Sequence, residues 1–423
     1  MLLVELIRKN PEEVKRKLAK KNFNQPEIVD EIISLDTKRK KVQTALDDFL
    51  SQRNTISKEI GSLMQSGQKE LAENKKNEIS TIKENTLVLE ADLKVVEDKL
   101  FNQLVTLPNL PSDLVPEGKT PEENVCTFIV KEIPVLSEDA KPHWELTEKY
   151  DIVDFELGVK LTGAGFPVYK GKGAILQRAL ISFFLDEAGK AGYNEVIPPL
   201  MVNEESAFAT GQLPDKEGQM YHVTEDKFYL IPTAEVPITN ILRGELLKEN
   251  QLPIKYTGYT PCFRREAGSY GKDVRGLNRL HQFDKVEIVQ AQHPDKSYET
   301  LDEMAKHVEN LLIKLELPYR ILRLCGGDMS FASALTYDFE AYSGAQKKWL
   351  EVSSVSNFET FQSNRLKLRF KNADGQNILA HTLNGSALAL PRIVACLLEN
   401  NQTPEGIKIP AVLQKYTGFD MIK

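Results

Sequence analysis

A seven-residue repeat of apolar side chains near the N-terminus limits the possible folds more than any other feature of the sequence. The repeat falls at Ile28, Leu35, Val42, Phe49, Ile56 and Leu63. A second series advances by three and four, at Ile79, Ile82, Thr86, Leu89, Leu93, Val96 and Leu100. Such spacing is typical of a coiled-coil seam. We expect an antiparallel helical hairpin, with a turn between Gly61 and Gly67, that extends roughly 55–60 Å at about 1.5 Å per residue.

The charge of this segment is compatible with two functions of the hairpin. Residues 1–107 carry 19 Lys and Arg against 18 Asp and Glu. The basic residues cluster at positions 8–9, 15–17, 20–21 and 38–41, which favours contact with a polyanion. Solvated helix faces often look the same, however, and a two-helix hairpin can also serve as a dimerisation or spacing element.

Prolines mark a boundary after the hairpin. Pro108, Pro111, Pro116 and Pro121 interrupt regular structure within a short stretch, because proline lacks a backbone donor and disfavours helix at the preceding residue. Beyond Val125 strand-like and helical stretches alternate, which indicates an α+β domain. We therefore predict a helical arm at 1–107, a proline-rich linker at 108–124 and a catalytic domain at 125–423.

Composition excludes several classes of protein. With 423 residues, 41% hydrophobic and 27% charged, the chain is neither disordered nor collagen-like. Its net charge of −7 gives no general attraction for nucleic acid, so a polyanion must meet a local patch. No apolar stretch of about 20 residues occurs, and we expect a cytoplasmic protein without a membrane partner. The wide spacing of the four cysteines and the absence of a helical histidine pair argue against bound zinc.

A long-looped β-hairpin is the first candidate site. Residues 256–266 and 279–290 read as two strands around a polar loop, and no P-loop sequence occurs anywhere in the chain. Because side chains alternate along a strand, five of them can converge: Arg264, Glu266, Arg279, Phe283 and Glu287. Arginine forks and an aromatic ring suit a nucleoside triphosphate. A surface hairpin with ordinary cross-strand ion pairs has the same pattern.

A second candidate lies near the C-terminus. Residues 377–384 read as a strand, and Gly385 and Ser386 lead into a predicted helix with an apolar face that Arg392 interrupts. A single arginine at such a place is more often a surface residue whose stem lies along apolar neighbours.

Taken in order, these segments resemble the three motifs of class II aminoacyl-tRNA synthetases: residues 192–199, the segment from 263–266 to Phe283, and the segment 384–392. Four further segments, at 233–235, 268–276, 351–354 and 382–386, narrow the resemblance to the bacterial type of the seryl-tRNA synthetase family over essentially the whole chain. The resemblance implies a class II antiparallel sheet flanked by helices, behind the N-terminal helical hairpin. It also implies a homodimer, and a hairpin that grips the long variable arm of tRNA(Ser).

The resemblance also implies roles for individual residues. The catalytic set comprises Arg264 at the α-phosphate and the serine carboxylate, Glu266 at the adenine amino group and Arg392 at the γ-phosphate. The other expected ATP contacts are Arg265, Arg279, Phe283 on the adenine face, Glu351, Val352, Ser353 and Ser354. Expected Mg²⁺ ligands are Glu351 and Ser354. The expected serine contacts are Thr233, Ala234, Glu235, Glu287, Asn384 and Ser386.

Two details complicate this assignment. Glu351 and Ser354 would point to opposite faces of a regular strand, so a bulge or a strand end is required between them. The general class II motif is richer in glycine just before the arginine, whereas this chain has Pro391 there, which puts the helix geometry before Arg392 in doubt.

The implied reaction joins L-serine to the 3′ end of tRNA(Ser) through seryl-adenylate, with contacts to tRNA from the arm and from the loop 268–276; charging of tRNA(Sec) is left open. A related ligase could instead transfer the amino acid to a carrier protein, although such an enzyme would not need the arm. A catalytically inactive RNA-binding homologue is a second alternative, and the intact set of charged residues argues against it. A different class II synthetase is a third, which the serine-type loop and the N-terminal position of the tRNA-binding element disfavour.

Overall fold

The chain divides into two units in the computed structural model, which describes residues 1–130, 132–215, 218–266 and 275–423. The smaller unit comprises residues 2–19 and 23–108, and the larger comprises residues 1, 20–22 and 109–423. Within the described ranges, every helix is too short or too polar to cross a bilayer.

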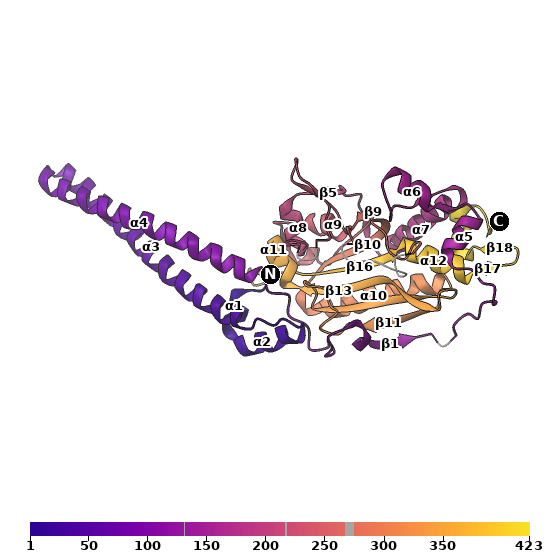
Figure 1. Ribbon diagram of the computed structural model, residues 1–423. Coiled ribbons are helices and arrows are strands. Elements are labelled where there is room, and N and C mark those ends of the chain that lie inside the picture. The colour runs from indigo at the N-terminus through magenta and orange to yellow at the C-terminus, as the bar shows by residue number, and fades with distance from the viewer. Residues whose placement is uncertain (131, 216–217, 267–274) are drawn as a thin grey trace. The chain divides into compact units, whose positions relative to one another are not determined.

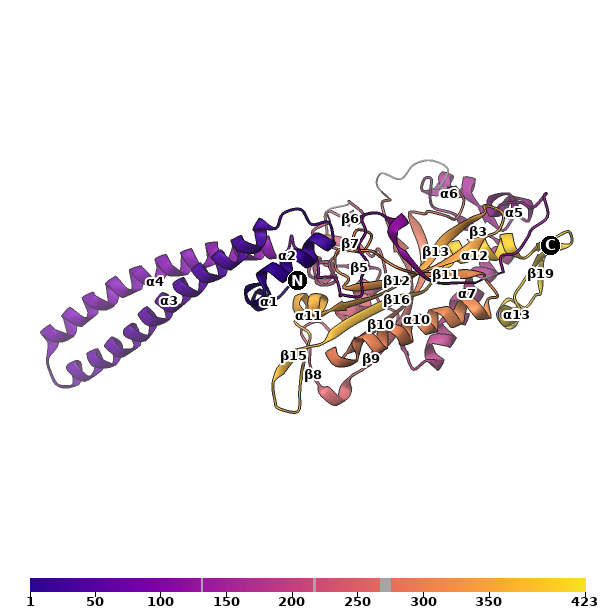
Figure 2. The same ribbon diagram turned by 90° about the horizontal axis from the view of Figure 1, so that it is seen from below.

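A long helical hairpin dominates the smaller unit. Its helices are α1 (Val4–Lys9), α2 (Pro11–Lys20), α3 (Glu27–Gln65) and α4 (Lys69–Leu104). Helices α3 and α4 run side by side in opposite directions (Figures 1 and 2), with seam residues such as Ile32, Leu46 and Val96 buried between them. The hairpin predicted from the heptads is confirmed. The turn is tighter than expected, because α3 continues through Gly61 and the break falls at residues 66–68.

A buried carboxylate links two helices of this unit. Asp36 is 3% exposed, and its oxygens lie 2.9 Å from nitrogens of Arg8, Arg39 and Lys40. Since Arg8 belongs to α1 and the others to α3, the cluster fastens α1 to the hairpin. It also neutralises part of the basic cluster at 38–41.

An eight-stranded sheet forms the centre of the larger unit (Figure 1). In spatial order its strands are β1 (Val125–Ile129), β11 (Tyr319–Arg323), β12 (Leu335–Ser343), β13 (Lys348–Glu359), β16 (His381–Ala389), β10 (Gln282–Gln292), β9 (Ile254–Phe263) and β4 (Asn194–Glu195). All neighbours are antiparallel except β4 and β9. The predicted antiparallel sheet flanked by helices is therefore confirmed.

The two faces of the sheet differ in chemistry. On β10, Val286 and Ile288 belong to a large apolar core, whereas Lys285 and Glu287 line a cavity. Period-two alternation produces this division. The same core contains apolar residues of α7 (Gly171–Lys190), α10 (Ser297–Lys314) and α12 (Leu390–Asn400). Helix α10 packs against β16 and β13 (Figure 2). These three helices thus cover one face. On the opposite face, Lys285 and Glu287 border the cavity, and Val289 packs against Ala234 and Ile238.

Shorter elements complete the unit. The helices are α5 (His143–Lys149), α6 (Phe155–Leu161), α8 (Glu204–Thr210), α9 (Glu235–Asn240), α11 (Thr360–Leu366) and α13 (Ala411–Thr417). The strands are β2 (Val153–Asp154), β3 (Val168–Tyr169), β5 (Met201–Val202), β6 (His222–Val223), β7 (Phe228–Leu230), β8 (Leu246–Lys248), β14 (Arg369–Lys371), β15 (Asn377–Leu379), β17 (Gln402–Thr403), β18 (Gly406–Lys408) and β19 (Met421–Ile422). Local signals set some ends: the Asn203 side chain accepts the Ser206 N–H at the start of α8, and Gly211, at φ 97°, ends it.

Several strand boundaries differ from the sequence expectation. The strand expected over 377–384 is two strands, β15 and β16, and the second continues to Ala389, so the helix expected after Ser386 begins at Leu390. Pairing with β10 on one side and β13 on the other holds β16 extended, and these tertiary contacts override the local helical pattern. The strand expected from residue 279 begins at Gln282.

Candidate active site

A cavity of about 620 Å³ opens on the polar face of the sheet. Most of the predicted site residues line it: Thr233, Glu235, Arg264, Glu266, Arg279, Phe283, Glu287, Glu351, Val352, Ser353, Ser354, Asn384, Ser386 and Arg392. Two predicted residues are not among those that line it. Ala234 is fully buried, and Arg265 is exposed, with its backbone N–H donating to Gln219 O at 2.9 Å. The segment 267–274, which contains most of the predicted tRNA-contacting loop, lies outside the described residues.

A buried polar cluster forms one end of the cavity. The Lys285 ammonium lies 2.5 Å from Glu287 Oε2 and donates to Thr233 Oγ1 at 2.9 Å. Thr233 Oγ1 in turn donates to Glu287 Oε2 at 3.1 Å. Lys285 and Glu287 are 6% and 2% exposed, so the pair holds charge where water is scarce and can orient a small charged ligand.

Glu235 adds a second carboxyl group to this end. Its Oε1 accepts a hydrogen bond from Gln362 Nε2 at 2.6 Å. Burial first, and then the charge of Glu287, raise the pKa of Glu235 to about 7, against the opposing effects of Gln362, Lys285 and Asn384. Two carboxyl groups that share a confined site cannot both ionise easily without a cation.

Arginines and an aromatic ring form the other end. The Arg264 guanidinium lies 5.2 Å from the centre of the Phe283 ring, and its Nε donates to Pro232 O at 3.2 Å. Glu266, which follows β9 with a φ of 49°, forms an ion pair with Arg279. A planar heterocycle can stack between a guanidinium and an aromatic ring, and the arginines suit phosphate oxygens.

Arg392 reaches the same cavity from α12. Its Nε donates to Asn278 O at 3.0 Å, and its Nη1 donates to Glu351 O at 2.7 Å. Pro391 does not disturb this placement, because it falls in the first turn of α12. Backbone N–H groups in that turn have no intrahelical acceptor, so proline costs no hydrogen bond there.

A β-bulge brings Glu351 and Ser354 to the same wall. The register of β12 and β13 pairs Phe339 with Ser353 and Glu340 with Glu351, which leaves Val352 as the extra residue. Both Glu351 and Ser354 line the cavity. The bulge that the sequence required is therefore present.

The oxygen groups at this wall fit a magnesium ion. In the neighbouring strand, Asp338 Oδ1 is buried and has no hydrogen-bond partner within the described part of the chain. Burial, followed by the charge of Glu351, raises the pKa of Asp338 well above its usual range. Magnesium prefers oxygen ligands and commonly uses one or two carboxylates together with substrate phosphates. Among the described residues no three His, Cys, Asp or Glu side chains gather as they would around a metal held by the protein alone.

Sequence reasoning missed several residues that line the cavity or contact the residues that do. Lys285 could have been found, because it alternates with Phe283 and Glu287 on one face of β10. Gln362 and Asn278 could not, since they come from α11 and from the segment before β10 and belong to no pattern. Both contact predicted residues, Gln362 at Glu235 and Asn278 at Arg392.

Comparisons with known proteins agree with this architecture. Residues 1–111 match the seryl-tRNA synthetase N-terminal domain, and residues 220–401 match the class II tRNA synthetase core domain (G, H, P, S and T). Proteins named serine--tRNA ligase from Salinibacter ruber and Chlorobaculum parvum are 48% and 46% identical, over 100% of this chain and 99% and 100% of theirs.

Solved structures give the same result. The crystal structure of seryl-tRNA synthetase from Pyrococcus horikoshii complexed with ATP has a TM-score of 0.92 and 35% identity, covering 100% of this chain and 99% of that one. The cytoplasmic serine-tRNA ligase from Naegleria fowleri in complex with AMP has a TM-score of 0.87 and 27% identity, with the same coverage. Together with the heptads, the sheet and the cavity, these matches show that the chain belongs to the seryl-tRNA synthetase family.

Proposed function

We propose that this protein is a serine--tRNA ligase, which activates L-serine with ATP and transfers it to tRNA(Ser). The observation that carries the proposal is a single cavity with a carboxylate-rich polar end and an arginine–aromatic end. One end suits an amino acid and the other a nucleotide. Full-length relatives bear the same name, which favours this function over a carrier-protein ligase or an inactive homologue.

The polar end would bind serine. Ionised Glu235 and Glu287 offer acceptors to its ammonium group, and Thr233, Asn384 and Ser386 offer partners for its hydroxyl group. A pocket built to hydrogen-bond a hydroxyl rejects an analogue that lacks it by roughly 10⁴–10⁵, because buried polar groups would then be unpaired. Alanine is excluded in this way.

The first step needs positioning more than proton transfer. The serine carboxylate is ionised at neutral pH, with a reference pKa of about 3.5, so its oxygen can attack the α-phosphorus directly. The bond from that phosphorus to the bridging oxygen breaks, and pyrophosphate leaves with the electron pair. Arg264 would hold the α-phosphate and the serine carboxylate, with Phe283 and Glu266 at the adenine and Arg392 at the γ-phosphate.

Glu351 and Ser354 would hold Mg²⁺, which supplies positive charge to the phosphates when bound. Arg265 and the exclusion of zinc stay predictions. In the second step the terminal hydroxyl of tRNA attacks the activated carbonyl, AMP leaves and the hydroxyl proton is released.

The remaining assignments concern partners and domain roles. We assign residues 1–107 to the arm that contacts the variable arm of tRNA, 108–124 to the linker and 125–423 to catalysis. A homodimer, a cytoplasmic location and the charging of tRNA(Sec) belong to the same proposal.

Amino-acid-dependent exchange of pyrophosphate into ATP, measured with each of the twenty amino acids, tests the activity. We expect exchange with serine, and none with alanine or threonine at the same concentration. Serylation of tRNA(Ser) transcripts, with a tRNA lacking a long variable arm as the control, tests the second step. Exchange with a different amino acid, or serine exchange without serylation of tRNA, would contradict the proposal.

A further inference from the structure

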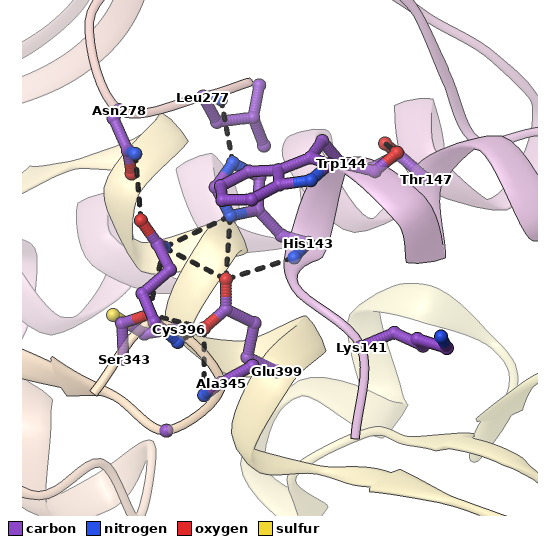
Figure 3. A network of polar contacts seen from close by, with 12 residues as sticks. Lys141, His143, Trp144, Thr147, Leu277, Asn278, Ser343, Ala345, Cys396 and Glu399 are labelled. Carbon is purple, nitrogen blue, oxygen red and sulfur yellow. Dashed lines mark hydrogen bonds and ion pairs between the residues drawn. The ribbon is translucent and has the colours of Figure 1, made fainter. Parts of the chain in front are cut away.

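A buried histidine–glutamate pair lies outside the cavity and has no role in the reaction described above. The side chains of His143 and Glu399 are both fully buried. Glu399 Oε1 lies 2.7 Å from His143 Nδ1 and also accepts the backbone N–H of His143 at 3.0 Å. Figure 3 shows the two side chains facing each other, with Leu277 and Asn278 on the far side of the imidazole. The pair joins the start of α5 to the end of α12.

The geometry fixes the tautomer of the imidazole. The backbone N–H of Leu277 points to His143 Nε2 at 2.9 Å, and a backbone amide can only donate. His143 Nε2 must therefore accept, which leaves the ring proton on Nδ1, directed at Glu399. A neutral imidazole in this tautomer satisfies both neighbours, and no other tautomer does.

Glu399 is held ionised by its donors. Burial would raise the pKa of Glu399, but hydrogen bonds from the His143 ring, from Ser343 and from the His143 backbone outweigh it and lower that pKa. Its Oε2 also accepts the backbone N–H of Ala345 at 3.2 Å, in the turn between β12 and β13. The carboxylate is thus fixed by two other segments of the chain, the start of α5 and the stretch that joins β12 to β13.

The pair connects with the cavity through the residues before β10. Leu277 and Asn278 both line the cavity, and the Asn278 carbonyl accepts the hydrogen bond from Arg392 Nε. The Asn278 side chain donates to Gln346 Oε1 at 2.9 Å, while Gln346 Nε2 donates to Glu399 Oε1 at 2.9 Å. Two routes therefore run from Glu399 to the backbone that contacts Arg392, one through His143 and one through Gln346.

Gly276 permits the close approach on which the first route depends. Its φ is +67°, and a Cβ built there would lie 2.3 Å from His143 Nε2. Only glycine leaves room for the imidazole to reach the next N–H.

We propose that His143, anchored by Glu399, is a positioning residue for the ATP end of the cavity. It holds the Leu277–Asn278 backbone so that the Asn278 carbonyl sets the direction of Arg392. The proposal rests on the function proposed above, because it assumes that Arg392 meets a phosphate of ATP. The proposal predicts an effect on one substrate only. Substitution of His143 should impair the use of ATP and leave the use of serine intact. The reason is that the serine end is formed by Thr233, Glu235 and Glu287, which lie on other elements.

Two variants of His143 separate positioning from simple stability. In His143→Asn the amide group falls near the position of Nδ1, so it can donate to Glu399 but cannot reach Leu277. In His143→Gln the amide oxygen falls near Nε2, so it can accept from Leu277 but no longer donates to Glu399. His307→Gln is the matched control, because it removes an imidazole of α10 whose buried Nε2 has no hydrogen-bond partner among the residues that the structure describes.

The full-length proteins would be compared by equilibrium binding of ATP alone, by KM for ATP and for serine in pyrophosphate exchange, and by thermal unfolding. For His143→Asn we expect weaker ATP binding and an ATP KM raised about tenfold, with the serine KM unchanged, as for a misdirected contact group. His143→Gln keeps the contact with Leu277 but loses the anchor at Glu399, so it should weaken ATP binding less than His143→Asn does. His307→Gln should bind ATP as the wild type does.

Three results would overturn the proposal: unchanged ATP binding in His143→Asn, equal losses in the Asn and Gln variants, or a parallel rise of both KM values that follows the loss of thermal stability. If His143→Asn does not fold, Gln346→Ala cuts the second route. ATP-selective weakening in Gln346→Ala would support the proposal, and wild-type ATP binding would contradict it. A wild-type protein without serine-dependent exchange would refute the proposed function, whereas the ATP-binding comparison needs no amino acid and tests His143 separately.

Discussion

At the scale of single residues, Glu235 shows how a buried carboxyl group couples the stability of the fold to pH. Its pKa of about 7 lies above the value of the unfolded chain, so the neutral form stabilises the fold. That stabilisation is complete below the unfolded pKa and is lost as pH rises through about 7. We therefore expect Glu235→Gln, without ligand, to unfold at a higher temperature than the wild type at pH 8 and at a similar temperature at pH 5.

Thermal unfolding at both pH values, with and without serine, tests this. Serine should stabilise the wild type at pH 8 and have little effect on Glu235→Gln, because the ligand ammonium supplies the missing positive charge. An equal response to pH in both proteins would mean that Glu235 is not the buried group that titrates.

A second prediction at this scale concerns Arg392. Arg392→Ala removes a fixed cation near the position proposed for the γ-phosphate, and loss of one such preorganised group typically costs about 10²–10³ in rate. Serine-dependent pyrophosphate exchange measures the effect, with Arg369→Ala, an exposed arginine on β14, as the control. Wild-type exchange in a folded Arg392→Ala protein would remove Arg392 from the proposed mechanism.

The residues that sequence reasoning found and missed differ in one physical respect. Arg264, Phe283 and Glu287 were found because strand alternation is a local rule and the resemblance supplied their order. His143 and Glu399 are 256 positions apart and belong to no periodic pattern. Their contact exists only because α5 and α12 pack together, and a single sequence carries no record of such packing.

At the scale of elements, local sequence patterns predicted the helices and strands that local interactions stabilise. Heptads predicted α3 and α4 because the seam repeats every seven residues along each helix. The end of β16 was misplaced because residues 386–389 look helical by themselves, whereas the pairing of β16 with β10 and β13 decides their conformation. The bulge at Val352 was required by the roles of Glu351 and Ser354, but only the register of β12 and β13 locates it.

The Asp36 cluster provides a test of how α1 is held. Asp36→Ala leaves Arg8, Arg39 and Lys40 without their shared carboxylate and should lower the free energy of unfolding by about 1–2 kcal/mol, less than for a fully buried pair because the cations are partly exposed. Thermal unfolding followed by circular dichroism measures it, with Asp48→Ala, an exposed acid on the same helix, as the control. Equal stability of the two variants would mean that the Asp36 cluster adds nothing to the stability of the fold, because water would solvate the three cations equally well.

At the scale of the whole molecule, the net charge is distributed unevenly between the N-terminal arm and the rest of the chain. Residues 1–107 are close to neutral, with 19 Lys and Arg against 18 Asp and Glu, and the remainder is acidic enough to give the whole chain its net charge of −7. An acidic catalytic part repels a polyanion at long range. Under the proposed function, we therefore expect most of the attraction for tRNA to come from the arm.

Cross-hairpin contacts define a shortened arm that tests this division. Gln103 Nε2 donates to Glu31 Oε2 at 2.8 Å, and the Lys75 ammonium lies 3.1 Å from Glu59, so Val42 and Asp92 face each other by the same register. Replacing residues 43–91 with a short Gly/Ser turn keeps the Asp36 cluster and the base of the seam.

We expect serine-dependent pyrophosphate exchange to survive in this variant and serylation of tRNA(Ser) to collapse. The affinity of the intact protein for tRNA should fall with salt, with a slope of about −0.7 to −0.9 per phosphate neutralised, and the shortened protein should show a shallower slope. Equal serylation by both proteins would make the hairpin a spacer, whereas loss of exchange would show that it supports the catalytic fold.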